Sequence, residues 1–295
     1  MEKLDAKEQA AAAVREHEDY VQRLASIHRT CSPVTDWQAR ATSRPPRKPS
    51  FSAENENKAR MQLELYKPSL LSRLFGQVEM QKGKLAELIA KGKISDERSF
   101  SERSNKYQQD LADHLDETAF AERILRKEPE AMLEAVKLFE PLSSIGLLGE
   151  HLGIKLPVPN VMDVELSVHG EEVVPKDRAK LLASGRASVK PMPKGEYYRL
   201  YQDHVCSAGL RVARELLALL PVDEVIVTAV DDLVDPATGH LKQTAILSFR
   251  APRATMVQLN FEAIDPSDSM RNFLHRMDFS TTTGFRPVES ITTST

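Results

Sequence analysis

Asp203, His204 and Cys206 combine the residue types of a cysteine nucleophile and its base. Such a thiol needs a histidine within hydrogen-bond reach to take its proton. The three residues fall in a segment with helical periodicity, and positions two apart on a helix face different directions. The histidine and the thiol therefore cannot share a proton directly. We interpret Cys206 as a small buried side chain of the core, and we predict no catalytic residue.

Carboxylates form a second cluster, Asp231, Asp232 and Asp235, directly after a run of β-branched residues. Carboxylates at a strand end can hold a divalent cation. A metal-dependent nuclease also needs an acid and a lysine on the following strand, and residues 243–250 contain neither. We therefore interpret the cluster as a solvent-exposed turn. The alternative function is an atypical metal-dependent nuclease or nucleic-acid-processing protein.

Basic side chains that could contact an anion or nucleic acid fall in two groups. One lies in a proline-rich stretch and the other in a helical stretch: Arg40, Arg44, Arg47 and Lys48, then Arg199, Arg211 and Arg214. Nucleic-acid sites usually add aromatic residues and a strongly positive charge balance, whereas the net charge here is −3. We expect both groups to be solvated faces, with Arg211 and Glu215 at ion-pair spacing. Anion or nucleic-acid contact is the alternative.

Other motifs that would identify an activity are absent from the sequence. It contains no phosphate-binding loop, dinucleotide fingerprint, nucleophile elbow or zinc-ligand spacing, so no cofactor is predicted. Its two cysteines, Cys31 and Cys206, are too few for a disulfide framework. The longest apolar run, 216–222, has seven residues, whereas a membrane span needs about 20. The first ten residues contain no signal-peptide core. We expect a cytoplasmic protein with no membrane partner.

The composition favours a helix-rich chain. Of 295 residues, 41% are hydrophobic, 28% are charged and only 12 are glycine, which suits helices better than an all-β barrel. We predict an α+β fold, in which a helical arm with an antiparallel helical hairpin precedes an α/β domain with a mixed sheet and a long central helix. The expected parts are a helix at 1–32, a Pro/Arg-rich linker at 33–53, the hairpin at 54–140, a connector at 141–160, the α/β domain at 161–290 and a disordered tail at 291–295.

The N-terminal half is expected to be helical apart from its linker. Apolar stripes predict helices at 70–91 and 97–127 that pair as the hairpin, with Gly92 ending the first. Trp37 is expected to anchor the linker. The helix at 5–31 carries histidines in its weak, coiled-coil-like apolar stripe and cannot stand alone in water. We expect it to dock on the hairpin or, as the alternative, on a second subunit.

In the C-terminal half, segments of alternating apolar and polar residues predict strands, and segments with a helical apolar period predict helices. The central helix is predicted at 196–220, packed on a hairpin of strands at 223–229 and 243–249. The remaining predictions are strands at 161–168, 171–174 and 187–190, helices at 176–184, 254–259 and 267–277, N-terminal capping by Asp265, and a chain end that frays after Val288.

Several short stretches resemble segments of a known protein family: 15–21, 36–37, 66–68 with 74–76, 200–203, 210–215, 219–222 and 265–268. In these stretches, and over most of its length, the chain resembles an uncharacterised bacterial family, whose members often carry a short β-rich domain ahead of this region. That domain is not in this sequence. The resemblance implies a bacterial cytosolic protein and supplies no activity, cofactor or catalytic residue.

The absence of a catalytic constellation and the partly polar helical stripes favour a non-enzymatic protein-binding or assembly factor. Its partner is expected to be another protein, or a second copy, held through the helical arm. Besides the nuclease alternative, a small-molecule hydrolase is a third hypothesis, which a deep polar pocket would favour.

Overall fold

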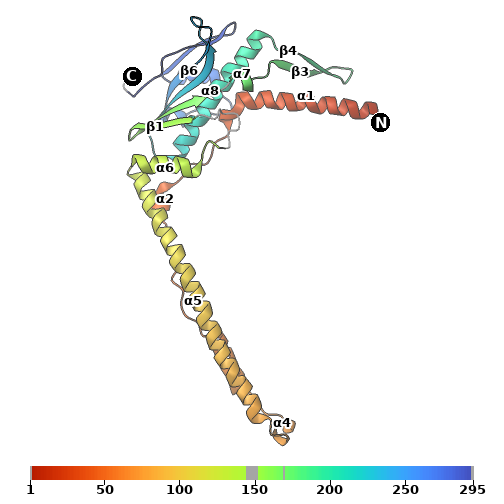
Figure 1. Cartoon of the computed structure of the whole chain (residues 1–295), viewed down its shortest axis with the longest axis vertical. Coiled ribbons are helices and arrows are strands. Elements are labelled where there is room, and N and C mark those ends of the chain that lie inside the picture. Colours follow the sequence, from red (N-terminus) through yellow and green to blue (C-terminus); the bar gives the residue numbers. More distant parts are fainter. Residues whose placement is uncertain (1, 144–151, 169, 294–295) are drawn as a thin grey trace. The chain divides into compact units, whose positions relative to one another are not determined.

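The computed structural model describes residues 2–143, 152–168 and 170–293, and its fold is α+β, as predicted. The chain forms two compact units (Figure 1). The first unit comprises residues 1–36 and 123–295, and the second comprises residues 37–122. Within the described residues, no helix is long and apolar enough to cross a membrane.

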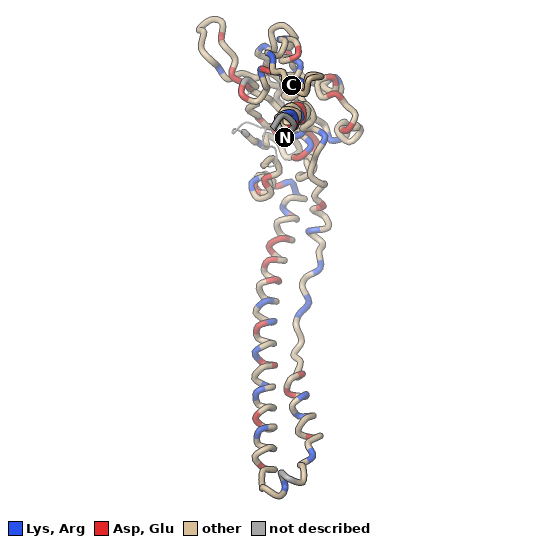
Figure 2. Tube along the Cα trace, turned by 90° about the vertical axis from the view of Figure 1, so that its right-hand side faces the viewer, with Lys and Arg blue, Asp and Glu red and all other residues tan. Residues whose placement is uncertain are grey.

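The second unit is built on one long helix. Its elements are α2 (Trp37–Ala41), α3 (Glu54–Glu64), α4 (Leu70–Leu74) and α5 (Val78–Leu125), of which the last three residues of α5 belong to the first unit. The prediction that 70–91 and 97–127 form two paired helices is wrong, because α5 runs unbroken for 48 residues. The segment antiparallel to α5 is α3, as the tube in Figure 2 shows.

Gly92 is a packing residue and not a helix stop. A Cβ atom at this position would lie 2.8 Å from the backbone carbonyl carbon and oxygen of Asn55. The glycine therefore lets the start of α3 approach the surface of α5. Next to it, Asp96 of α5 caps α3, because its carboxylate accepts hydrogen bonds from the backbone N–H groups of Asn55 (3.2 Å) and Glu56 (2.9 Å).

Aromatic contacts hold the linker in the second unit. Trp37 is only 4% exposed, and its ring meets the ring of Phe120 edge-on at 5.8 Å. Farther along, the rings of Phe51 and Phe100 meet edge-on at 5.6 Å. The anchoring role predicted for Trp37 is confirmed.

A six-stranded mixed sheet forms the centre of the first unit, in the order β1-β2-β5-β6-β7-β8. Strands β2 and β5 are parallel and the other neighbours are antiparallel. The strands are β1 (Leu152–Val158), β2 (Val161–Ser167), β5 (Glu224–Val234), β6 (Leu241–Pro252), β7 (His275–Ser280) and β8 (Gly284–Arg286). A separate two-stranded sheet pairs β3 (Asp177–Leu181) with β4 (Ala187–Pro191).

The long helix α8 (Lys194–Leu219) is the central buried element, as predicted. It packs on β5 and β6 (Figure 1). Gly209 permits the closest approach, since a Cβ atom there would lie 2.9 Å from the ring of Phe249 on β6. Leu216 is fully buried.

Four local predictions in this half are wrong. Residues 171–174 belong largely to a short helix, α7 (Gly170–Val173), whereas 176–184 contains strand β3. Gly185, at φ +79°, lies in the turn between β3 and β4. The predicted helix at 267–277 is only α10 (Pro266–Ser269) with a 3-10 turn, after which β7 begins. Strand β1 lies in the expected connector, whose residues 144–151 are outside the described ranges.

Other short elements agree better with the sequence. Helix α6 (Pro129–Phe139) precedes the connector, and α9 (Arg253–Met256) follows β6. The cap of α10 is confirmed, because the Asp265 carboxylate accepts the backbone N–H of Asp268 at 2.9 Å. The expected fraying after Val288 is wrong, since Ile291 is buried and its N–H donates to the hydroxyl oxygen of Ser248. Of the expected disordered tail, residues 294–295 lie outside the described ranges.

The N-terminal helix α1 (Glu2–Ser26) continues into the 3-10 helix η1 (Ile27–Arg29) and docks within the first unit. It packs on α8 and on the β3–β4 sheet, so the expected docking on the hairpin of 70–127 is wrong (Figure 1). The Tyr20 hydroxyl donates to the carbonyl of Val173 at 2.7 Å. His28 is fully buried against Ser207 of α8, with its Nδ1 2.8 Å from the hydroxyl oxygen.

Candidate functional site

A buried ion pair on α8 fixes the chain that follows η1. The guanidinium of Arg211 lies 2.6 Å from the carboxylate of Glu215, and the two side chains are 8% and 0% exposed. Arg211 also donates to the hydroxyl of Thr30, and Glu215 accepts the backbone N–H of Ser32 at 3.0 Å. The predicted pairing is confirmed, but the expected solvated face is wrong, because residues 30–32 cover it.

Arg214 extends this polar contact by one turn of the helix. Its guanidinium donates to the backbone carbonyls of His28 and Arg29, the latter at 3.0 Å. The same group stacks over the ring of Phe261, 3.9 Å from its centroid. Burial lowers the pKa of the Arg214 guanidinium, and the nearby positive charge of Arg211 lowers it further. The group nevertheless stays protonated, because arginine does not lose its proton in proteins.

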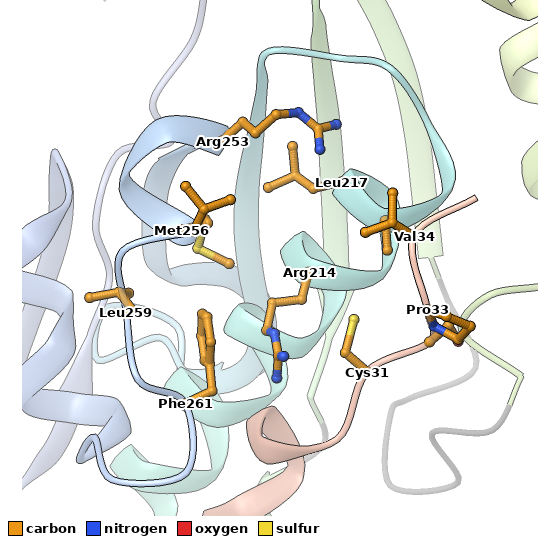
Figure 3. Close-up of a pocket in the computed structure, with 12 residues that line it drawn as sticks. Cys31, Pro33, Val34, Arg214, Leu217, Arg253, Met256, Leu259 and Phe261 are labelled. Atoms are coloured by element: carbon orange, nitrogen blue, oxygen red, sulfur yellow. The ribbon is translucent and has the colours of Figure 1, made fainter. Parts of the chain in front are cut away.

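An open groove of about 440 Å³ lies beside these contacts (Figure 3). Three separate segments line it: residues 31–34, the C-terminal part of α8, and the stretch after β6. Its walls are mainly apolar and include Pro33, Val34, Leu217, Met256, Val257, Leu259 and Phe261. This lining differs from the deep polar pocket that would favour the hydrolase hypothesis.

Arg253 gives the groove a second cation. Its guanidinium donates to the carbonyls of Val222 (2.9 Å) and Leu220 (2.6 Å), which lie just after α8. Burial lowers the pKa of the group, although the charge of Asp223 opposes this shift. Neither Arg253 nor Phe261 was predicted from the sequence as a site residue. No local motif marks either residue, because the groove exists only when three distant segments meet.

The two thiols occupy different surroundings. Cys31 is half-buried in the wall of the groove, and burial, followed by the charge of Glu215, raises the pKa of its thiol. Cys206 is fully buried, with its Sγ 4.0 Å from Sδ of Met277, and burial raises the pKa of that thiol strongly. Both groups are therefore neutral thiols near pH 7. The interpretation of Cys206 as a core residue is confirmed.

The three aspartates of the metal hypothesis do not converge. The interpretation of the cluster as a solvent-exposed turn is wrong for Asp231, which is buried in strand β5 and accepts hydrogen bonds from the backbone N–H of Gly170 (2.9 Å) and from the hydroxyl of Tyr201. Asp232 is its exposed neighbour on the strand, where successive side chains point to opposite faces. Asp235 accepts the N–H of Ala237 in the following turn. Within the described ranges, no three His, Cys, Asp or Glu side chains are grouped to hold a metal ion.

The predicted basic residues lie in several places. Arg211 and Arg214 adjoin the groove, whereas Arg199 is exposed nearer the start of α8. Arg40 is an exposed residue of helix α2 in the second unit. The extended proline-rich stretch after it carries three more exposed basic residues, and Figure 2 shows no acid along that stretch: Arg44, Arg47 and Lys48. Arg40 also lies over the ring of Trp37, 5.4 Å from its centroid.

Comparison with protein-family models, with curated proteins and with solved structures found no match to this chain. The resemblance to a bacterial family therefore stays a prediction.

Proposed function

We propose that this protein is a non-enzymatic binding or assembly factor that holds a protein partner through one end of its helical hairpin. The observation that supports this proposal is a cluster of exposed apolar side chains, here called the apolar tip, on residues 65–80 of the second unit. Its members are Leu65 (65% exposed), Leu70 (83%), Leu74 (82%), Phe75 (68%) and Met80 (57%).

Hydrophobic side chains scattered singly over a surface need no explanation, whereas five within sixteen residues do. Burying each of them against a partner would contribute about 1.5–3 kcal/mol. On the described remainder of α5 the exposed large apolar side chains lie farther apart, at Leu88 (45%), Ile94 (64%) and Leu115 (57%). Ion pairs one turn apart accompany them, such as Glu87–Lys91 and Arg98–Glu102. Such pairs belong to a solvated helix.

The tip is built on a defined turn. The Tyr66 hydroxyl donates to the side-chain carbonyl of Gln81 and so ties the end of α3 to the start of α5. Gly76, at φ +65°, makes the turn between α4 and α5, a backbone conformation that glycine adopts without strain. The apolar side chains therefore lie on α4, at the start of α5 and at the end of α3, around one turn, and this arrangement suits a preformed contact surface.

A photo-crosslinking amino acid at Leu74 in native cells tests the proposal. We expect a discrete adduct with one protein at this position and none at the exposed Lys106 of α5, which serves as the matched control. The adduct mass separates a partner protein from a second copy of this chain. Replacing Leu70, Leu74 and Phe75 by serine should abolish the same adduct when the crosslinker is placed at Met80. No adduct at Leu74, or equal adducts at Leu74 and Lys106, would refute the proposal.

A further inference from the structure

We propose that the groove between residues 31–34, α8 and the stretch after β6 binds the free carboxyl terminus of a polypeptide whose last residues are apolar. The site lies in the first unit, apart from the apolar tip, and the inference does not depend on the function proposed for that tip. Its support is the charge of the groove, its apolar walls and the unpaired backbone along one wall.

The groove carries positive charge, and some N–H donors of its arginines are not engaged. Arg214 and Arg253 line it, and the lining includes no Asp or Glu of the described residues. Arg253 donates through Nε and one terminal nitrogen, which leaves its other terminal nitrogen without a partner among the described residues. Arg214 donates through one terminal nitrogen only. A guanidinium has five N–H donors and binds a carboxylate through two at once, so both side chains keep donors for an anion.

The acidic residues near the groove do not pair directly with the guanidinium groups of Arg214 and Arg253. Glu215 is engaged by Arg211 and by the N–H of Ser32. Glu262 and Asp223 act on the two guanidinium groups electrostatically from outside the lining. A ligand carboxylate would therefore be the anion in direct contact with the arginines.

Exposed apolar side chains stand on two sides of the groove. Val34 is 73% exposed and Val257 is 75% exposed, and both belong to the lining, whereas Met256, also in the lining, is buried. A cavity of about 440 Å³ falls in the size range of ligand sites, and it is open along its length rather than enclosed. An apolar side chain beside the carboxylate would cover both valines.

The backbone of residues 33–35 favours a peptide over a small carboxylate. The N–H of Thr35 donates to the carbonyl of Ala218 at 2.8 Å, which holds this segment beside the end of α8. The N–H and carbonyl of Val34 have no hydrogen-bond partner within the described residues. An extended peptide can pair with such groups, and terminal-carboxylate capture combined with backbone pairing is a recurring mode of peptide recognition.

Cys31 provides a direct reporter of occupancy. It lies in the groove wall and is half-buried, whereas Cys206 is 0% exposed, so a maleimide reacts with Cys31 first in the folded protein. The probe is an acetylated pentapeptide, Gly-Ser-Val-Leu-Leu, with a free carboxyl terminus, and its amide is the matched control. We expect the free acid to slow labelling and to bind about tenfold or more tightly than the amide, since the lost contacts are charge-assisted hydrogen bonds.

Variants at exposed positions separate binding from folding. Val34→Asp places a negative charge in the groove, and we expect it to abolish binding of a fluorescent form of the peptide, measured by anisotropy. Val189→Asp is the matched control, because Val189 is 65% exposed on β4, outside the lining. Circular dichroism checks that both variants fold.

Three results would overturn the proposal. The first is equal protection by the free acid and the amide, and the second is no protection by either. The third is protection by octanoate without protection by the peptide, which would make the groove a site for a small apolar carboxylate. None of these results bears on the crosslink at Leu74, so the two proposals fail independently.

Discussion

Glu215→Ala tests whether the buried ion pair of α8 is the main attachment of the chain after η1. The substitution leaves the guanidinium of Arg211, 8% exposed, without its carboxylate and the N–H of Ser32 without its acceptor. Removing one partner of a buried pair typically costs about 3–5 kcal/mol, because the remaining charge is uncompensated. The first unit has roughly 200 residues. At about 2–4 °C per kcal/mol for that size, the expected fall in melting temperature is about 6–20 °C.

The assay is thermal unfolding followed by circular dichroism, with Glu196→Ala as the matched control. Glu196 of α8 also pairs with an arginine, Arg178 of β3, at 3.3 Å, but the two side chains are 49% and 36% exposed. Such a pair is worth about 0–1 kcal/mol. Replacing Arg211 and Glu215 together by methionine should restore most of the stability, since no buried charge remains. A loss below about 1 kcal/mol for Glu215→Ala, or a double variant as unstable as the single one, would refute the reasoning.

Two further predictions test the packing of the two units, one in each unit. Burial lowers the pKa of His204 to about 4 where its ring meets the backbone of Leu24 and Val168, so the unfolded chain binds a proton below pH 6.5 that the folded chain does not. The contribution of His204 to stability should therefore fall by about 2 kcal/mol between pH 7.5 and pH 5, whereas Asp203, whose pKa burial raises to about 6, acts in the opposite direction over the same range. In urea titrations, the stability difference between His204→Asn and the parent chain should change by about 2 kcal/mol over this range, and a constant difference would contradict the reasoning. In the second unit, Gly92→Ala should lower the melting temperature despite its better helix propensity, because its Cβ meets backbone at 2.8 Å. Gly83→Ala should raise the melting temperature, because a Cβ atom at Gly83 has no neighbouring atom within 4 Å. A higher melting temperature for both variants would exclude the close approach of α3 to α5.

The sequence was most informative where a segment has a residue pattern that fits only one type of secondary structure. Helix α8 has a wide apolar face, and the β-branched run before Asp231 forms β5, so both elements and their packing were predictable. The same reasoning failed for α5, because a glycine inside a helical pattern reads as a stop. Gly92 instead accommodates the backbone of Asn55, a contact that only the folded chain brings about.

Short segments were predicted less well because their patterns admit two structures. Residues 176–184 contain too few positions to distinguish a helical period from an alternating one, and pairing with β4 decides for a strand. The groove was not predictable at all. Arg214, Arg253 and Phe261 are ordinary residues in their local context, and their proximity depends on how α1, α8 and the end of β6 pack together.

The docking of α1 shows why a stripe with polar residues can still bind strongly. Judged by its apolar surface alone, the N-terminal helix is marginal, and His28 looks unfavourable in such a position. In the fold, however, His28 finds Ser207, while the residues after it meet Arg211, Arg214 and Glu215 of α8. Each of these side chains has at least one polar partner, although Nε2 of His28, Nε of Arg211 and Oε2 of Glu215 have none within the described residues. Paired polar groups of this kind fix one register where an apolar seam would allow several. The same contacts hold the segment that carries Val34, so the wall of the groove depends on the ion pair beneath it.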